Sequence, residues 1–246
     1  MEKKEQSIIR VTLFGACGRM GSETASLLSK EPDYQLVNLV ESREHPSQGN
    51  ILFGLRLCSE LSKEEMKGTV CCEFTNHLAA LKNASLAVEA GCPILVGTTG
   101  FSAAELQLLK RLGEKIAVML APNLSRGVDL LYRLAEISAR VLAEGFGVEI
   151  VEAHHRWKQD APSGTAKKLA EIIKEQGGFR EVPTHSLRMG DITGEHRIIF
   201  AGEGETVEII HRATSRRAFA CGVPPALKFL SSAPAGFYNF RDCLGV

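Results

Sequence analysis

Residues 8–21 read I-I-R-V-T-L-F-G-A-C-G-R-M-G, an apolar run that leads into three regularly spaced glycines. The run predicts a strand over residues 8–14, and residues 22–30 have helical character. A strand that passes through a glycine loop into a helix lets backbone N–H groups approach a pyrophosphate. The spacing is G-x-x-G-x-x-G rather than the usual G-x-G-x-x-G. The interpretation therefore depends on the position of the glycines between a strand and a helix. This stretch predicts a Rossmann-type parallel sheet that binds a dinucleotide.

An acidic residue follows the second predicted strand, residues 35–40. Glu41 stands twenty residues beyond Gly21, the distance at which a carboxylate accepts hydrogen bonds from the adenosine ribose. The alternative is an ordinary solvated strand end. Ser42 and Arg43 come next, and together with Arg19 they could meet the 2′-phosphate of NADPH. The sequence therefore favours neither NADH nor NADPH.

Further short strands are predicted at residues 70–74, 93–96 and 116–120. In an open parallel sheet, ligands gather beyond the carboxyl ends of the strands. The small residues Gly97-Thr98-Thr99-Gly100 stand at such an end and are candidates for cofactor contact. Ser102 and Glu105 have the spacing of a capping box, which predicts that a helix starts there.

Residues 149–166 read E-I-V-E-A-H-H-R-W-K-Q-D-A-P-S-G-T-A and predict a strand, a charged loop and the start of a helix. The Ser163-Gly164-Thr165 turn can cap that helix, and a helix N-terminus is a natural seat for a carboxylate or phosphate. His154 and His155 could instead bind zinc, but no third His or Cys stands at ligand spacing, so no metal site is predicted. Lys158 could be simply solvated.

The motif E-x-H-H-x-x-K-x-D-A-P-S-G-T-A resembles the signature of the 4-hydroxy-tetrahydrodipicolinate (dihydrodipicolinate) reductases of lysine and diaminopimelate biosynthesis. The resemblance implies that His154 is a proton donor or acceptor and that Lys158 is a proton donor. It also implies that three residues bind the dicarboxylate substrate: His155, Gly164 and Thr165.

The same resemblance extends over nearly the whole chain, including G-A-C-G-R-M-G near the start and G-F-Y-N-F-R-D near the end. It implies that NADPH or NADH is bound by one set of residues: Gly15, Ala16, Cys17, Gly18, Arg19, Met20, Glu41, Gly97, Thr98, Thr99, Ala121, Pro122, Asn123 and Leu124. The chain departs from the expected pattern at Pro224-Pro225, which should delay a regular helix until about residue 224, and at two single positions. Ser42 replaces an arginine found after the acidic residue in many members, and Leu124 replaces an aromatic residue.

Composition limits the partners. Lys plus Arg equal Asp plus Glu at 29 each, so no global field attracts the chain to nucleic acid or to an acidic membrane. Residues 1–5 are charged rather than apolar, and no apolar run is long enough to span a bilayer, so we expect a cytoplasmic protein. The seven cysteines form no C-x-x-C pair and are expected to be structural, reduced thiols.

We therefore expect an α/β fold with a discontinuous dinucleotide-binding domain, residues 1–125 and 214–246. The inserted α+β domain, residues 126–213, is expected to have an open mixed sheet that binds substrate and oligomerises, by the resemblance as a homotetramer.

The expected activity is NAD(P)H-dependent reduction of 4-hydroxy-tetrahydrodipicolinate to tetrahydrodipicolinate. One alternative is another NAD(P)-dependent oxidoreductase of a small dicarboxylate, such as a semialdehyde dehydrogenase, but no cysteine stands convincingly at a helix start as its nucleophile. The other is a non-enzymatic nucleotide-sensing module, which would not need the intact catalytic stretch.

Overall fold

The computed structural model describes residues 8–245. Residues 1–7, which include the charged residues 1–5 used for the cytoplasmic expectation, lie outside the described part of the chain. The described chain divides into two compact units: unit 1 ends at Leu124 and resumes at Phe219, and unit 2 is Ser125–Ala218. The second crossing between units lies at 218/219, whereas the sequence suggested 213/214.

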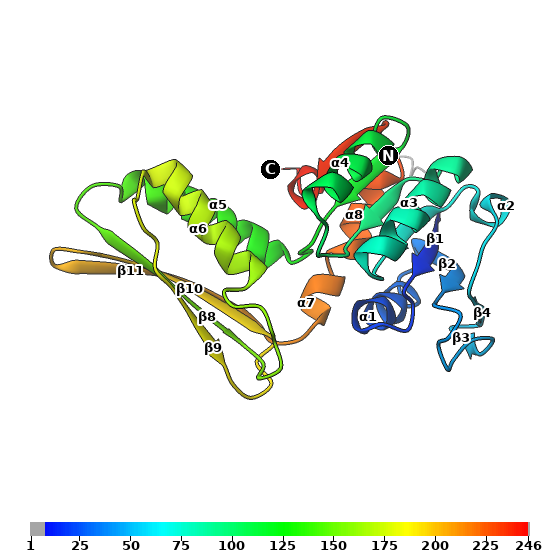
Figure 1. Ribbon diagram of the computed structural model, residues 1–246, viewed down its shortest axis with the longest axis horizontal. Coiled ribbons are helices and arrows are strands. Elements are labelled where there is room, and N and C mark those ends of the chain that lie inside the picture. Colours follow the sequence, from blue (N-terminus) through cyan, green and yellow to red (C-terminus); the bar gives the residue numbers. More distant parts are fainter. Residues whose placement is uncertain (1–7, 246) are drawn as a thin grey trace, which may run out of the picture. The chain divides into compact units, whose positions relative to one another are not determined.

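Unit 1 contains an eight-stranded sheet with the order β12-β7-β6-β5-β1-β2-β4-β3 (Figure 1). All neighbouring strands are parallel except the β3–β4 pair. The strands are β1 (Ile9–Phe14), β2 (Tyr34–Val40), β3 (Ile51–Leu52), β4 (Leu55–Cys58), β5 (Val70–Glu73), β6 (Ile94–Val96), β7 (Ala117–Leu120) and β12 (Gly236–Asn239). The helices are α1 (Arg19–Leu28), α2 (Lys63–Met66), α3 (His77–Ala90), α4 (Ala103–Leu112), α8 (Val223–Leu230) and the 3₁₀ helix η1 (Phe240–Cys243), with α7 (Arg217–Ala220) at the crossing.

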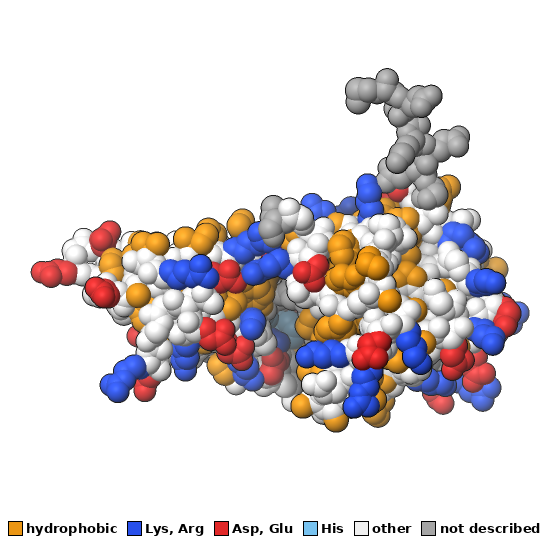
Figure 2. Space-filling view, turned by 90° about the horizontal axis from the view of Figure 1, so that it is seen from above, with side chains coloured by type: hydrophobic (Ala, Val, Ile, Leu, Met, Phe, Trp, Pro, Cys, Tyr) orange, Lys and Arg blue, Asp and Glu red, His pale blue; other side chains and the backbone are white. Residues whose placement is uncertain are grey.

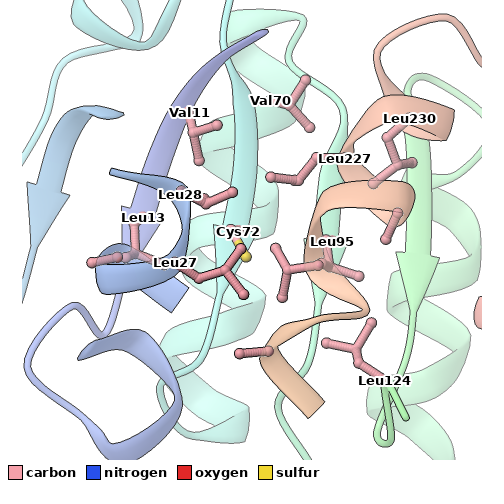
Figure 3. Close-up of a cluster of buried hydrophobic side chains, with 14 of the residues drawn as sticks. Val11, Leu13, Leu27, Leu28, Val70, Cys72, Leu95, Leu124, Leu227 and Leu230 are labelled. Atoms are coloured by element: carbon pink, nitrogen blue, oxygen red, sulfur yellow. The ribbon is translucent and has the colours of Figure 1, made fainter. Parts of the chain in front are cut away.

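Hydrophobic side chains cover both faces of this sheet. Every residue of β5 is buried, as expected for a parallel strand with helices on both sides. Adjacent residues of β5 point to opposite faces, so Cys72 joins one buried cluster and Cys71 the other. Figure 3 shows the first cluster, in which Val11 and Leu13 of β1 lie with Leu227 and Leu230 of α8. The sheet therefore forms a rigid base for the loops at its carboxyl edge.

The strand order reverses at β1, which lies between β2 and β5. Dinucleotides bind at this kind of switch point, beyond the carboxyl ends of the strands. Gly15 ends β1 with φ +75°, and a Cβ there would lie 2.6 Å from the carbonyl oxygen of Phe74. Only glycine lets the two strand ends approach this closely.

Unit 2 is a four-stranded mixed sheet with two helices on one face (Figure 1). Its strand order is β11-β10-β8-β9; β8 and β9 are parallel and the other pairs antiparallel. The elements are α5 (Arg126–Val141), β8 (Gly147–His154), α6 (Gly164–Gly177), β9 (Thr184–Arg188), β10 (Gly194–Gly202) and β11 (Glu205–Ala213). Alternate residues of β10 are buried, among them Ile198 and Phe200 against the helices. The opposite face of the sheet carries the less buried residues of β10.

The fold class expected from the sequence is confirmed, and so is the capping box of Ser102 and Glu105. Helix α1 begins at Arg19, whereas the sequence suggested helical character from residue 22. The sequence analysis predicted neither the hairpin of β3 and β4 nor strand β12.

Charged side chains of both signs lie on the surface. Figure 2 shows acidic and basic side chains interspersed on the face that it displays, in keeping with equal numbers of the two kinds. No helix within residues 8–245 has both the length and the apolar character needed to cross a membrane.

Candidate active site

Strand β8 places a buried carboxylate beside the first histidine of the pair. Glu152 is fully buried, and its Oε2 lies 2.5 Å from Nδ1 of His154. The two residues are separated by one position, so both point to the same face of the strand. Because an ionised carboxylate only accepts hydrogen bonds, Nδ1 carries the proton and Nε2 presents its lone pair. Glu152 thus fixes both the orientation and the tautomer of His154.

Arg188, the last residue of β9, holds Glu152 from the other side. Its Nη1 lies 2.9 Å from Oε2 and its Nη2 lies 2.7 Å from Oε1, a bidentate pair. The same Nη2 donates to the carbonyl oxygen of Asp160 at 2.6 Å, which ties the loop after β8 to the sheet. Burial raises the pKa of Glu152, but hydrogen bonds, first of all from Arg188, outweigh it and bring the pKa to about 2. Glu152 is therefore ionised at neutral pH.

The pKa of His154 is lowered. Burial, the largest cause, disfavours the imidazolium, and together with the charges of Lys158 and Arg188 it outweighs the hydrogen bond and charge of Glu152, which raise the pKa. His154 is consequently neutral at pH 7, and its free Nε2 can accept a proton.

A second histidine, His196 of β10, lies behind the first. The two rings meet edge to face with centroids 5.3 Å apart. Nε2 of His196 lies 3.1 Å from Oγ of Ser163, whose oxygen also accepts from the backbone N–H of Ala166 and caps α6. Burial, followed by the nearby charge of His154, brings the pKa of His196 down to about 3. His196 therefore stays neutral and supports the start of α6.

The low pKa of His196 predicts a pH-dependent stability. An unfolded histidine has a pKa of about 6.5, so between about pH 6.5 and 3 the unfolded chain binds a proton there that the folded chain does not. As the pH is lowered through this window, the free energy of unfolding should decrease by about 1.4 kcal/mol per pH unit from this group. Melting curves at several pH values should show that the free energy of unfolding depends on pH more steeply in the wild type than in His196→Gln, by this amount. Parallel pH profiles for the two proteins would contradict the assignment.

The loop after β8 carries the remaining candidate residues of this unit. Nζ of Lys158 pairs with Oδ1 of Asp160 at 2.7 Å, and the backbone N–H of Lys158 donates to the carbonyl oxygen of His155. The half-buried His155 has an Nδ1 for which the described residues offer no hydrogen-bond partner. Arg156 lies over the ring of Trp157, 5.3 Å from its centroid. The loop therefore gathers a histidine and cations beside His154.

The start of α6 faces open space. Gly164 is exposed, and a Cβ there would meet no atom within 4 Å. Thr165 is the next helical residue and is half-buried. With Ser163 satisfied as the cap, the first backbone N–H groups of the helix and its positive dipole end can meet an anion at Gly164.

The glycine loop of unit 1 leads directly into α1. Gly18 is its N-cap with extended backbone, and Arg19 and Met20 are already helical. Oε2 of Glu41 accepts from the backbone N–H of Cys17 at 3.0 Å, and Oε1 accepts from that of Ser42 at 2.9 Å. Glu41 therefore lies over the loop, as a carboxylate that meets the ribose should.

Glu73, which the sequence analysis did not consider, joins the two next turns at the carboxyl edge. It is fully buried at the end of β5 and accepts from the backbone N–H of Thr75 at 2.6 Å and from Asn83 at 2.7 Å. Its Oε1 also lies 3.4 Å from Oγ1 of Thr98, which is buried, while Thr99 is exposed. Gly97 is required because a Cβ would lie 2.2 Å from the ring of Phe74.

The fourth turn follows β7. Ala121 and Leu124 are buried in the core, Asn123 is half-buried and Pro122 is exposed. The side chain of Leu124 belongs to the cluster of Figure 3. The structure thus brings the candidate cofactor residues together at one edge of the unit 1 sheet, and the candidate substrate residues together in unit 2.

Sequence reasoning missed Arg188 and His196 because both reach the site by strand pairing. In the register of the sheet, Arg188 is the partner of His154 and His196 is the partner of Glu152. The only local signal was Glu152 itself, inside the E-x-H-H motif and one position from His154.

Comparisons with known proteins cover both units. Residues 9–124 match the family described as "Dihydrodipicolinate reductase, N-terminus", and residues 127–244 match "Dihydrodipicolinate reductase, C-terminus". The 4-hydroxy-tetrahydrodipicolinate reductase of Aquifex aeolicus is 39% identical, covering 97% of this chain and 99% of that protein. That of Syntrophus aciditrophicus is 36% identical with the same coverage. The dipicolinate-bound dihydrodipicolinate reductase of Paenisporosarcina sp. TG-14 has a TM-score of 0.78 at 25% identity, covering 94% of this chain and 97% of that chain.

Proposed function

The chain belongs to the dihydrodipicolinate reductase family, and from this membership we infer that it reduces 4-hydroxy-tetrahydrodipicolinate to tetrahydrodipicolinate with NADH or NADPH. The observation that supports this most is the cluster in unit 2, where residues 154–164 provide a neutral histidine, a lysine and an open helix N-terminus. These are the groups that proton transfer to a bound dicarboxylate requires.

The proposed reaction consumes a hydride and a proton and releases water. When bound, the dihydronicotinamide supplies a hydride to a ring carbon of the unsaturated imine. The substrate's hydroxyl leaves as water, and one proton is taken up for each hydride. The chain's own task is to bind the dicarboxylate, orient it and provide that proton.

We assign proton transfer to Lys158 and His154. The ammonium of Lys158 can donate the proton and attract the negative charge of the substrate. Nε2 of His154 can then shuttle or orient the proton, because Glu152 and Arg188 hold the ring. His155 and the Gly164-Thr165 helix start bind the carboxylates, with space over Gly164 for one of them.

An assay of NADH and NADPH oxidation with the unsaturated dicarboxylate tests the function. Both cofactors should support turnover and bind within about a hundredfold of each other, a gap of roughly 2.7 kcal/mol. The physical reason is that Glu41 suits ribose hydroxyls while exposed Arg19 and Arg43 can meet a 2′-phosphate. Substrate-dependent oxidation of neither cofactor would contradict the function, and a larger gap would contradict dual use.

Two glycines of the loop separate cofactor binding from folding. Gly18→Ala should weaken binding of NADH by about tenfold or more, because the methyl group crowds the pyrophosphate. Among the described residues that Cβ would lie 3.3 Å from Gly15 O and 3.9 Å from Phe74 O, so the melting temperature should change little. Gly21→Ala is the matched control, since its Cβ would lie 1.9 Å from the same oxygen and should destabilise the fold. Fluorescence titration with NADH and thermal melting measure both. Unchanged NADH affinity in Gly18→Ala would contradict the placement of the pyrophosphate.

We also propose that unit 2 assembles the enzyme into a homotetramer through its sheet. One face of the sheet is covered by α5 and α6, while residues such as Leu187, Met189 and Ile210 remain exposed. Light scattering that found only monomer at micromolar concentration would contradict this. The need for nicotinamide cofactors and the absence of a disulfide among the described residues fit the cytoplasm, which we propose as the compartment.

A further inference from the structure

Three different metal-ligating side chains meet in unit 1. One ligand atom each from Cys17, Glu41 and His45 lies within 4.8 Å of the other two. They come from the glycine loop, the end of β2 and the loop that follows it, and all three are half-buried. Spacing in the sequence did not indicate a metal site, because Cys17 and Glu41 are 24 residues apart.

Hydrogen bonds hold the cluster in place. The backbone N–H groups of Cys17 and Ser42 each bind one oxygen of Glu41, and each oxygen keeps lone pairs free. The His45 loop is closed by bonds from His45 N to Ser42 O and from Gln48 N to His45 O, both 3.0 Å. The side-chain amide of Gln48 bonds to the carbonyls of Glu41 and Ser42 at 2.8 Å. These bonds fix the backbone that carries the three ligand atoms, which already lie within 4.8 Å of one another.

A hydrogen bond fixes which nitrogen of the neutral His45 ring carries the proton. Nδ1 accepts from the backbone N–H of Ser47 at 3.2 Å, so the neutral ring carries its proton on Nε2. An ion bound at Nδ1 would replace this contact and keep the same tautomer.

The donor set selects the kind of ion. Thiolate, imidazole and carboxylate together suit Zn²⁺, with water in the fourth position, whereas Mg²⁺ and Ca²⁺ favour oxygen alone. We propose that Cys17, Glu41 and His45 bind a zinc ion that excludes the adenosine ribose from Glu41, so that zinc and the nicotinamide cofactor compete. On binding, the S–H bond of Cys17 breaks, a Zn–S bond forms and the proton passes to solvent.

The competition rests on the proposed function, since Glu41 cannot serve the ribose and the ion together. Zinc should raise the KM for NADH and leave kcat at saturating NADH unchanged. It should not compete with the dicarboxylate, whose candidate ligands lie in unit 2.

Cobalt(II) added to the purified enzyme provides a direct optical test. A thiolate-to-cobalt charge-transfer band should appear, disappear in Cys17→Ser and be displaced by zinc. His45→Gln should weaken cobalt binding by at least about tenfold. Loss of a residue that only supports a metal ligand usually costs that much, and loss of a ligand should cost no less. Cys221→Ser, which removes an exposed thiol elsewhere, is the matched control and should keep the band. Absence of the band in wild type, or its persistence in Cys17→Ser, would overturn the site.

Titration of NADH into the cobalt-loaded enzyme then tests the competition without turnover. The band should decrease as NADH binds. A band that remains while NADH is shown to bind would overturn the competition and leave the proposed function standing. If neither NADH nor NADPH binds the metal-free enzyme, the proposed function fails, whereas the cobalt band and its loss in Cys17→Ser still decide the metal site.

Discussion

Replacing Lys158 with alanine should lower kcat by about 10²- to 10⁴-fold, the usual share of general acid catalysis. The affinity for NADH should be nearly unchanged, because the candidate dinucleotide loop belongs to unit 1 and Lys158 to unit 2. Steady-state kinetics with saturating substrate and a separate NADH titration measure the two quantities. His154→Ala should behave similarly but less severely if His154 mainly shuttles or orients the proton.

Lys168→Ala is the matched control for this experiment. Lys168 lies on α6 in an exposed pair with Glu171, and its removal should leave kcat unchanged. If Lys158→Ala kept near-normal kcat and lost only affinity for the dicarboxylate, Lys158 would be a carboxylate anchor. The acid would then have to be His154 or water.

Arg188→Leu should destabilise the protein by about 3–5 kcal/mol at neutral pH, because it leaves the buried carboxylate of Glu152 without its bidentate partner. It should also lower kcat, because Glu152 without Arg188 is less firmly held and orients His154 less well. Chemical denaturation and steady-state kinetics measure the two effects.

The destabilisation should depend on pH in a defined direction. Glu152 has a folded pKa of about 2, below the unfolded value of about 4.3, so its pair contributes fully above about pH 4 and is lost as the pH falls toward 2. The difference between wild type and Arg188→Leu should therefore be largest at neutral pH and shrink in acid.

Arg212→Leu breaks a more exposed ion pair, that with Glu195 on β10, and should barely change the melting temperature. Equal effects of Arg188→Leu and Arg212→Leu would contradict the role given to the buried pair.

The local patterns predicted the parts of the fold that local chemistry decides. Gly15 and Gly21 must be glycine because their neighbours leave no room for a Cβ, so the loop after β1 was visible in the sequence. The capping residues Ser102 and Ser163 likewise predicted the starts of α4 and α6, since each side chain accepts a hydrogen bond from a backbone N–H of its own helix.

Pairing between distant segments could not be predicted in this way. β12 is a strand only because it lies parallel to β7, and Arg188 reaches Glu152 across 36 residues. The hairpin of β3 and β4 was missed because Phe53, rather than Asn or Gly, takes the first position of positive φ in its turn, before Gly54.

The central claim is that hydride passes from the nicotinamide to a ring carbon of the dicarboxylate while the protein provides the proton. The most direct measurement uses NADH with deuterium in place of both hydrogens at the reactive carbon of the nicotinamide, in ordinary water, with mass spectrometry of the product. The account predicts tetrahydrodipicolinate with one deuterium on a ring carbon for each NADH oxidised. Unlabelled product, or NADH oxidation that does not depend on the dicarboxylate, would contradict it.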